Sequence, residues 1–294
     1  MDLLLTLTAR VVVAGLNLLP LPLVARIGRI GGLIAWRLDR RHRKVALTNL
    51  EATFPDKSKA EILQLTREHF ARLGENYTCA ARTARMTPEQ VAQVLDLQGF
   101  DKIKLELSQD GCHRIVVALG HFGNFELYAR THPGLPDMRL ATTYRGLRHP
   151  RLSRFLRNLR ERSGCLYFDR RHDGPALRAA LAKPGIALGL LADQHAGDRG
   201  LRLPFLGRET SCSAAPAIFA RRFDCRLFTM TCQRTALARW RIELGDEIPV
   251  RHNGRDRSTA DITADINAAL EAAIHRDPAN WFWVHNRWKT IPRA

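Results

Sequence analysis

The hydrophobic pattern divides the chain into an apolar first segment and a longer part in which strand and helix patterns alternate. Residues 3–34 are mostly Leu, Val, Ile, Ala and Gly, and their longest uncharged run, 11–25, contains Pro20 and Pro22. A helix that spans a bilayer needs about 20 apolar residues in succession. The pattern therefore predicts two short apolar helices with a break at the prolines, lying in or dipping into a membrane surface. The alternative is a hydrophobic helix docked on the core.

A basic cluster follows this apolar segment directly, and it contains Arg37, Arg40, Arg41, Arg43 and Lys44. A charge run alone is usually a solvated face, but its position beside an apolar segment matches anionic lipid headgroups on the cytoplasmic side of a membrane. We expect an N-terminal membrane-anchoring segment over residues 1–36 and one larger domain over residues 37–294.

The larger domain begins with helices and continues with alternating strands and helices. Ser58 and Glu61 have the spacing of a capping box and open a helical region over residues 57–97, in which Thr87 marks a second helix start. Strands are expected at 114–119, 138–144, 186–191, 227–232 and 240–244. Helices are expected after Phe125 and Pro150 and at 176–182, 214–222 and 262–274, and a Gly-rich loop is expected at 194–213. This alternation predicts one α/β domain with a mostly parallel sheet flanked by helices.

The charge balance is unusual and points to anionic partners. Forty-six Lys and Arg residues against 29 Asp and Glu residues give a net charge of +17, which suits acidic lipid, an acidic protein or nucleic acid. A non-catalytic protein that binds nucleic acid is disfavoured, because the chain has no recognisable nucleic-acid module and begins with an apolar segment. The six cysteines show neither C-x-x-C nor zinc-finger spacing, and no signal peptide is evident, so we expect free thiols and no metal site.

The sharpest chemical signal is the segment 120–126 (GHFGNFE), which follows a buried strand and opens a helix. Catalytic groups in α/β folds gather at the carboxyl ends of strands. His121 can remove a proton from a hydroxyl near neutral pH, and a carboxylate such as Glu126 can hold its other ring nitrogen. The two side chains meet only if His121 lies in the turn before the helix, with Asn124 as a plausible N-cap. The alternative is a strand–helix loop with an incidental His and Glu.

Nothing in the sequence marks a protein nucleophile or a phosphate loop. G-x-S-x-G, P-loop and G-x-G-x-x-G patterns do not occur. A His–Glu pair without a nucleophile indicates direct transfer of a group to a substrate hydroxyl.

With this segment the chain resembles the lipid A late acyltransferases, often called lauroyl/myristoyl acyltransferases. They belong to the wider lysophospholipid acyltransferase group that carries the His-x4-Asp/Glu signature. The similarity runs over nearly the whole chain. Its blocks are 49–55 (NLEATFP), 120–126, Tyr144-Arg145 with Pro150, 169–171 (DRR), 191–194 (LADQ), 204–207 (PFLG) and 278–290 (PANWFWVHNRWKT). Asn286 stands where the family commonly has Arg, which puts acceptor preference in doubt.

The resemblance implies a bacterial inner-membrane enzyme with its active site at the cytoplasmic face. It implies transfer of a fatty acyl group from an acyl carrier protein thioester to a hydroxyl of a lipid A precursor, with no metal or organic cofactor. His121 would be the general base and Glu126 the residue that orients it. The open alternative keeps acyl transfer but changes the acceptor to a lysophospholipid or a glycosylated phosphatidylinositol, with acyl-CoA or acyl carrier protein as donor.

Three further residues are candidates for substrate binding. Arg145 suits an acceptor phosphate or the oxyanion, and Arg170 suits a phosphate. Asp193 follows a strand and is either a site residue or the cap of the next turn. The alternative is that Arg145 and Arg170 are ordinary surface arginines. Likewise, His195 could be a plain loop residue, and the arginines that recur every third residue from 145 to 160 could form a solvated face. Those arginines could otherwise face an acidic carrier protein or anionic lipid. Trp281, Trp283 and Trp288 fit the core better than a membrane belt.

Overall fold

The computed structural model describes residues 1–104 and 113–289, and Cys112 and Thr290 lie outside the described residues. The α-helices are α1 (Asp2–Asn17), α2 (Leu21–Leu38), α3 (Arg40–Thr53), α4 (Lys59–Thr83), α5 (Pro88–Ala92), α7 (Pro150–Glu161), α8 (Gly174–Leu181), α9 (Ala215–Arg222) and α10 (Thr259–Arg276). The 3-10 helices are η1 (Phe125–Arg130), η2 (His132–Gly134) and η3 (Pro278–Asn280). The strands are β1 (Leu95–Gln98), β2 (Arg114–Leu119), β3 (Arg139–Tyr144), β4 (Leu166–Asp169), β5 (Ile186–Leu191), β6 (Leu201–Phe205), β7 (Arg208–Cys212), β8 (Arg226–Ala236), β9 (Arg239–Glu247), β10 (Arg251–His252) and β11 (Arg255–Asp256).

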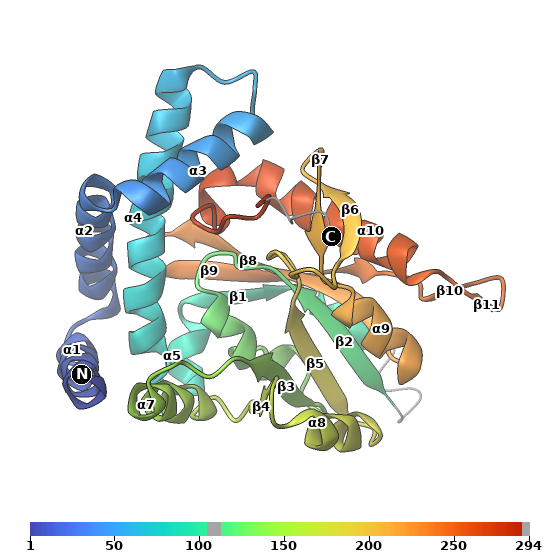
Figure 1. Ribbon diagram of the computed structural model, residues 1–294. Helices are drawn as coiled ribbons and strands as arrows, with labels where there is room; N and C mark the ends of the chain where they lie inside the picture. Colours follow the sequence, from blue (N-terminus) through green and yellow to red (C-terminus); the bar gives the residue numbers. More distant parts are fainter. Residues whose placement is uncertain (105–112, 290–294) are drawn as a thin grey trace.

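A seven-stranded sheet forms the centre of the molecule, in the order β1-β9-β8-β2-β5-β3-β4. All neighbouring pairs are parallel except the β8–β9 hairpin. Figure 1 shows α1, α2 and α4 together on one side of this sheet, α7 and α8 below it, α9 to its right and α10 along its upper side. The predicted α/β fold with a mostly parallel sheet is confirmed.

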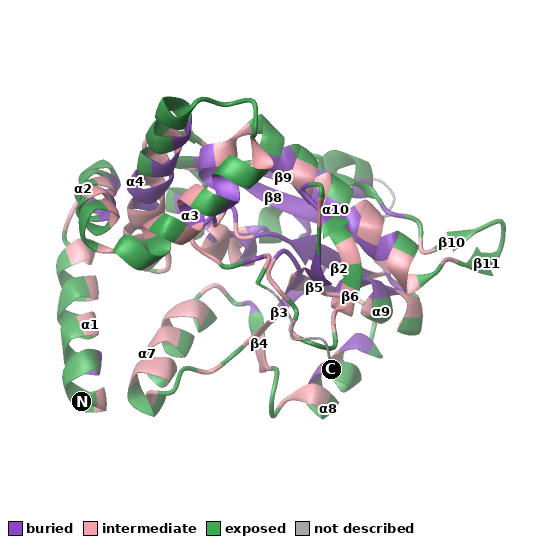
Figure 2. Cartoon of the chain, turned by 45° about the horizontal axis from the view of Figure 1, so that its top comes forward, coloured by how far each residue is buried: buried purple, intermediate pink, exposed green. Residues whose placement is uncertain are grey.

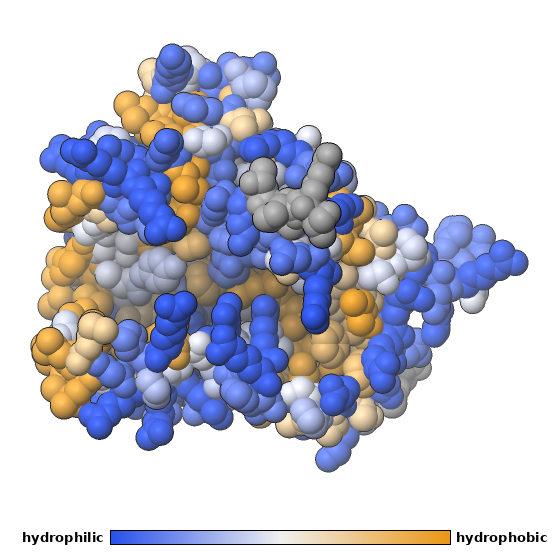
Figure 3. All heavy atoms as spheres, in the orientation of Figure 1, coloured by the Kyte–Doolittle hydropathy of each residue, from blue (hydrophilic) through white to orange (hydrophobic). Residues whose placement is uncertain are grey.

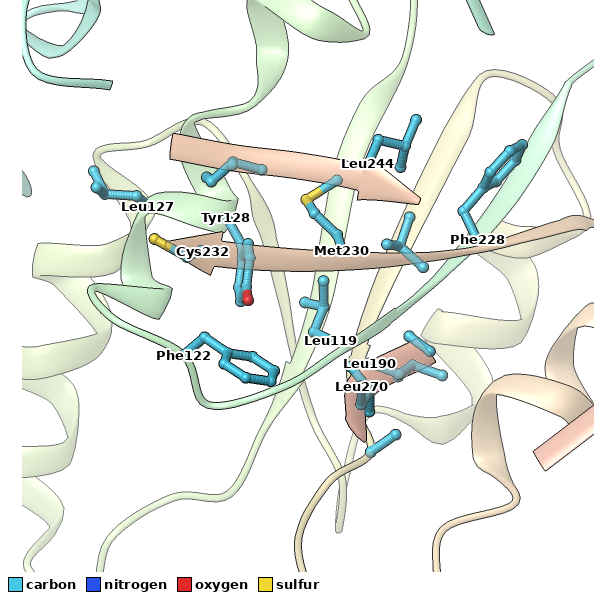
Figure 4. Packing of buried hydrophobic residues seen from close by; sticks show 14 of the residues in the cluster. Leu119, Phe122, Leu127, Tyr128, Leu190, Phe228, Met230, Cys232, Leu244 and Leu270 are labelled. Carbon is cyan, nitrogen blue, oxygen red and sulfur yellow. The ribbon is translucent and has the colours of Figure 1, made fainter. Parts of the chain in front are cut away.

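The core follows from the apolar runs of the central strands. In β2, every residue from Ile115 to Leu119 is buried, as expected for a strand covered on both faces. Figure 4 shows Leu119 of β2 and Phe122 of the following turn close to Met230 and Cys232 of β8. This packing holds the carboxyl end of β2, where the candidate site begins, in a fixed position.

The N-terminal helices pack on the rest of the chain through α4. Helices α1 and α2 are separate, as the prolines predict, because α1 ends at Asn17 and α2 begins at Leu21. Val24 and Ala25 of α2 are fully buried. At Gly32 a Cβ would lie 2.0 Å from the backbone oxygen of Phe70 in α4, so only glycine allows the two helices to approach this closely. None of the helices in the described part of the chain is both long enough and apolar enough to cross a bilayer.

The local predictions succeeded best where apolar runs or caps were strong. The strands at 114–119 and 186–191 have the expected bounds, and the capping box of Ser58 and Glu61 is present. The loop expected at 194–213 is wrong, because β6 and β7 form an antiparallel hairpin inside it. Its turn carries Leu206 and Gly207 at φ values of 51° and 72°; a leucine at positive φ gives no recognisable hairpin signal. Strand β1 also replaces part of the helical region expected over 57–97.

Candidate active site

His121 lies in the turn between β2 and η1, as expected. Gly123 allows this turn, because its φ is +48° and a Cβ there would approach the Cys232 backbone oxygen to 2.7 Å. Asn124 occupies the N-cap position of η1, but its side chain makes no capping hydrogen bond and its Nδ2 donates instead to Thr83 Oγ1 at 3.4 Å. The imidazole packs beside Phe125 and Phe282, with ring centroids 5.1 Å and 5.7 Å away.

The carboxylate that contacts His121 is Asp193, whereas the sequence predicted a contact with Glu126. Asp193 follows β5, the parallel neighbour of β2, so both residues lie at the same edge of the sheet. His121 Nδ1 lies 2.7 Å from Asp193 Oδ1, and the His121 backbone N–H donates to Oδ2 at 2.7 Å. Asp193 is 1% exposed and faces His121, and its expected role in substrate binding stays a prediction. Glu126 does not take the orienting position.

This contact fixes the tautomer of His121. An ionised carboxylate only accepts hydrogen bonds, so Nδ1 carries the proton and Nε2 presents its lone pair. Burial raises the pKa of Asp193, but the charge of His121 and hydrogen bonds from His121 and Trp281 outweigh burial and leave that pKa below its usual value. In the neutral imidazole this contact leaves the Nε2 lone pair free to accept a proton.

Glu126 forms an ion pair with Arg160 of α7. The Arg160 Nε lies 3.0 Å from both carboxylate oxygens of Glu126, and the side chains are 35% and 25% exposed. The expected pairing with His121 is not made, because Asp193 contacts His121 Nδ1 and Glu126 faces Arg160. Burial alone would lower the pKa of Arg160. The hydrogen bonds to Glu126 and the charges of Glu126, Tyr167 and Tyr77 outweigh burial and raise this pKa.

Two cavities meet at His121, and Glu126 and Arg160 line both of them. The first has a volume of about 320 Å³ and walls that are mostly apolar, including Leu73 of α4 and Leu156 and Leu159 of α7. The second has a volume of about 600 Å³ and is more polar. Figure 3 shows the hollow on this face, with apolar walls and a row of hydrophilic side chains along its lower edge. Volumes of this size are typical of small-molecule sites.

The more polar cavity holds the two arginines that the sequence singled out. Arg145 follows β3, Arg170 follows β4, and both line this cavity. Partial burial and the neighbouring charge of Arg145 lower the pKa of Arg170. Arg157 and Arg160 complete the basic wall, and Glu126 is the one carboxylate among the described residues that line it. Such a wall suits an anionic group such as a phosphate.

The segment after η3 completes the site, and sequence reasoning assigned it no role there. Trp281 is 2% exposed and donates its indole N–H to Asp193 Oδ2 at 2.7 Å. Trp283 is fully buried, so the core interpretation of these two tryptophans is confirmed. His285 Nε2 accepts the backbone N–H of His195 at 3.1 Å and so holds the loop after β5. Burial lowers the pKa of His285 to about 4, which keeps it neutral. The expected departure from the family, Asn286, is exposed and lines neither cavity.

Metal ligands were not expected, and residues 1–104 and 113–289 contain no group of three His, Cys, Asp or Glu side chains arranged to hold an ion.

The chemistry that the His121–Asp193 contact supports is removal of a proton from a hydroxyl by His121 Nε2.

Comparison with known proteins identifies the family of this chain. Residues 4–290 match the family model described as bacterial lipid A biosynthesis acyltransferase. The chain is 27% identical over 280 residues to the lipid A biosynthesis palmitoleoyltransferase of Escherichia coli (strain K12), covering 93% of this chain and 87% of that protein. An acyltransferase of Shigella flexneri gives the same values. The lipid A biosynthesis myristoyltransferase of E. coli is 35% identical over 83 residues, which is 28% of this chain and 24% of that protein. The chain therefore belongs to the bacterial lipid A biosynthesis acyltransferases and is an O-acyltransferase.

Proposed function

We propose that this enzyme moves a fatty acyl group from an acyl carrier protein thioester to a hydroxyl of a lipid A precursor, at the cytoplasmic face of the bacterial inner membrane. The observation that carries the proposal is the contact of His121 Nδ1 with the buried carboxylate of Asp193 where an apolar and a basic cavity meet. The site offers one base and two compartments of different polarity, as this reaction requires.

In the proposed reaction His121 Nε2 takes the proton of the acceptor hydroxyl while the hydroxyl oxygen attacks the thioester carbonyl. The tetrahedral intermediate then expels the thiolate, and the thiolate receives from His121 the proton that the acceptor hydroxyl lost. The oxyanion needs a donor close to the base. Arg160 fits this role, because its guanidinium lines both cavities where they meet, and the ion pair with Glu126 fixes its position. Glu126 thereby acts through Arg160.

The two cavities divide the substrates by chemistry. The apolar cavity between α4 and α7 suits a hydrocarbon chain, since burial of methylene groups is favourable at about 0.8 kcal/mol each. The basic cavity suits the phosphorylated part of an acceptor, held by Arg145 and Arg170. The exposed arginines of α7 offer a basic surface beside this cavity for an acidic carrier protein.

Membrane association is supported by the exposed apolar faces of α1 and α2. On α2, the exposed residues Ile27, Ile30, Ile34 and Leu38 recur at helical spacing. On α1, Leu4, Leu7 and Val11 are exposed in the same way. Figure 3 shows the resulting apolar patches along the left edge of the molecule, where Figure 1 places these helices. Apolar faces beside the basic start of α3 suit an anionic membrane surface on which the helices lie.

The experiment is acyl transfer by purified protein in detergent. The acceptors are a tetraacylated lipid A precursor bearing Kdo sugars and, in parallel, a lysophospholipid, each with acyl carrier protein and CoA thioesters. We expect His121-dependent product on the lipid A precursor with the carrier-protein donor, loss of product in His121→Ala, and full activity in His132→Ala, an exposed histidine outside both cavities. Product on the lysophospholipid alone would overturn the acceptor, and full activity of His121→Ala would overturn the mechanism.

A further inference from the structure

The buried carboxylate of Asp193 receives a third hydrogen bond that the proposed reaction has not used. Oδ1 faces His121 Nδ1, while Oδ2 accepts the His121 backbone N–H and the indole N–H of Trp281, all at 2.7 Å. The Asp193 side chain is fully buried, so these three donors replace the water that would otherwise solvate the charge.

Trp281 is held rigidly where it makes this contact. It forms an isolated antiparallel bridge with Phe122, and the adjacent Asn280 backbone oxygen accepts the Gly123 N–H at 3.1 Å. Its ring packs on Trp283 at a centroid distance of 4.7 Å and on Phe205 at 5.6 Å. The segment after η3 therefore braces the turn that carries His121 and delivers the indole N–H to Asp193.

We propose that Trp281 is a positioning residue for acyl transfer, which fixes the rotamer and charge of Asp193 and through it the tautomer and orientation of His121. This inference rests on the proposed role of His121 as the base. A supporting group of this kind orients the one that contacts the reactants, and its removal typically lowers activity by about tenfold to a hundredfold.

The loss of one donor has a defined effect on the carboxylate. Without the indole N–H, Oδ2 keeps a single partner, the backbone N–H of His121, so two hydrogen bonds instead of three hold the carboxylate against Nδ1. The ionised form of Asp193 also becomes less favourable, because burial already disfavours it and one of the hydrogen bonds that oppose burial is lost. The titratable groups around Asp193 are His121, Tyr128 and His285. Burial keeps Tyr128 protonated and His285 neutral near pH 7.

Trp283 is a matched control within the same segment. It is also buried, it packs edge-to-face on Trp281, and its indole N–H donates a single hydrogen bond, to the backbone oxygen of Pro278. Trp281→Phe and Trp283→Phe thus remove the same ring atoms and one hydrogen bond each from one aromatic cluster. The two changes differ in whether the lost bond reaches Asp193.

The test compares kcat, KM and the pH–rate profile of both variants. The assay temperature is one at which thermal melting curves show both variants to be folded. We expect Trp281→Phe to lower kcat by about tenfold to a hundredfold with KM unchanged, and to alter the pH–rate profile. Trp283→Phe should keep the wild-type profile and kcat within about twofold. In an Asp193→Asn background, Trp281→Phe should cause no further loss, because its effect passes through Asp193.

Equal losses in the two tryptophan variants, or an additive loss in the Asp193→Asn background, would overturn this inference while leaving His121 as the base. Full activity of His121→Ala would instead remove the function on which it rests. Should Trp281→Phe fail to fold, ¹⁵N-indole spectra of otherwise wild-type protein and of Asp193→Asn decide. One buried indole N–H resonance must shift when the carboxylate is replaced, and five unchanged indole resonances would contradict the contact.

Discussion

Replacement of Asp193 by asparagine tests the assignment of the orienting carboxylate. Asp193 accepts three N–H donors, two at Oδ2 and one at Oδ1. Asparagine has a single oxygen, which can keep the two donors at Oδ2 if its amide NH₂ replaces Oδ1. The NH₂ then faces His121 Nδ1, and two donors cannot share that contact. The imidazole relieves the conflict when Nδ1 becomes the acceptor and the proton moves to Nε2.

The magnitude follows from what the wrong tautomer can do. A protonated Nε2 has no lone pair for the acceptor hydroxyl, so the base function is lost while substrate binding in the two cavities remains. A comparable change in serine proteases lowers kcat by about 10⁴-fold. We expect Asp193→Asn to lower kcat by about 10³- to 10⁴-fold, which is about 4 to 5.5 kcal/mol of transition-state stabilisation, with KM within about threefold.

The assay is steady-state acyl transfer with Glu126→Gln as the comparison. Glu126→Gln weakens the ion pair with Arg160, so we expect a smaller loss of about tenfold, additive with Asp193→Asn and non-additive with Arg160→Ala. The reasoning is refuted if Asp193→Asn keeps more than a tenth of the wild-type kcat. It is also refuted if Glu126→Gln and Asp193→Asn are non-additive with each other, since Glu126 would then act through His121.

Three further outcomes follow from the described contacts. Alanine at Arg145 or Arg170 should raise KM for a phosphorylated acceptor by about tenfold, leave kcat nearly unchanged and weaken the salt dependence of KM, measured in acceptor titrations. Ile30→Glu should reduce binding to anionic vesicles in flotation assays by more than tenfold, without loss of transfer in detergent, whereas Lys57→Glu at an exposed site outside that face should bind almost normally. Burial lowers the pKa of His69 to about 4, below that of an unfolded histidine. The unfolded state therefore gains a proton first, and the free energy of unfolding should fall between pH 6.5 and pH 4. The loss at pH 5 is on the order of 2 kcal/mol for this residue, and urea denaturation of His69→Gln should show a shallower decline.

The fold was predictable where the signal is local. The run 114–119 is apolar and β-branched, and β2 and β5 pair in the middle of the sheet with the expected bounds. The edge strands β1 and β4 have four residues each and were missed, because so short a run shows no clear alternation. Figure 2 shows the difference, because the central strands are buried while α1 and α7 at the margin are largely exposed or half-buried. Burial pattern gives a strong sequence signal only where both faces of an element are covered.

The site was predictable in part, because its histidine lies in a recognisable turn and the carboxylate partner does not. His121 was found from a histidine placed directly after a buried strand. Asp193 is 72 residues further along the chain, so no spacing relates the two. The available signal was that both follow buried strands, whose carboxyl ends meet at one edge when the strands pair in parallel. The spacing of Glu126 suggested a contact with His121 that Asp193 makes instead, and Trp281 reaches the site only through the tertiary fold.

The central claim is that Asp193 holds His121 with its proton on Nδ1 and its lone pair on Nε2. The most direct test is the tautomer of His121 in ¹⁵N-histidine-labelled protein, observed above the pH at which the ring is protonated and assigned by loss of the signal in His121→Gln. The account predicts a protonated Nδ1 and an unprotonated Nε2 in wild type and in Glu126→Gln, and the opposite tautomer in Asp193→Asn. A protonated Nε2 in wild type, or a tautomer that follows Glu126 and ignores Asp193, would contradict it.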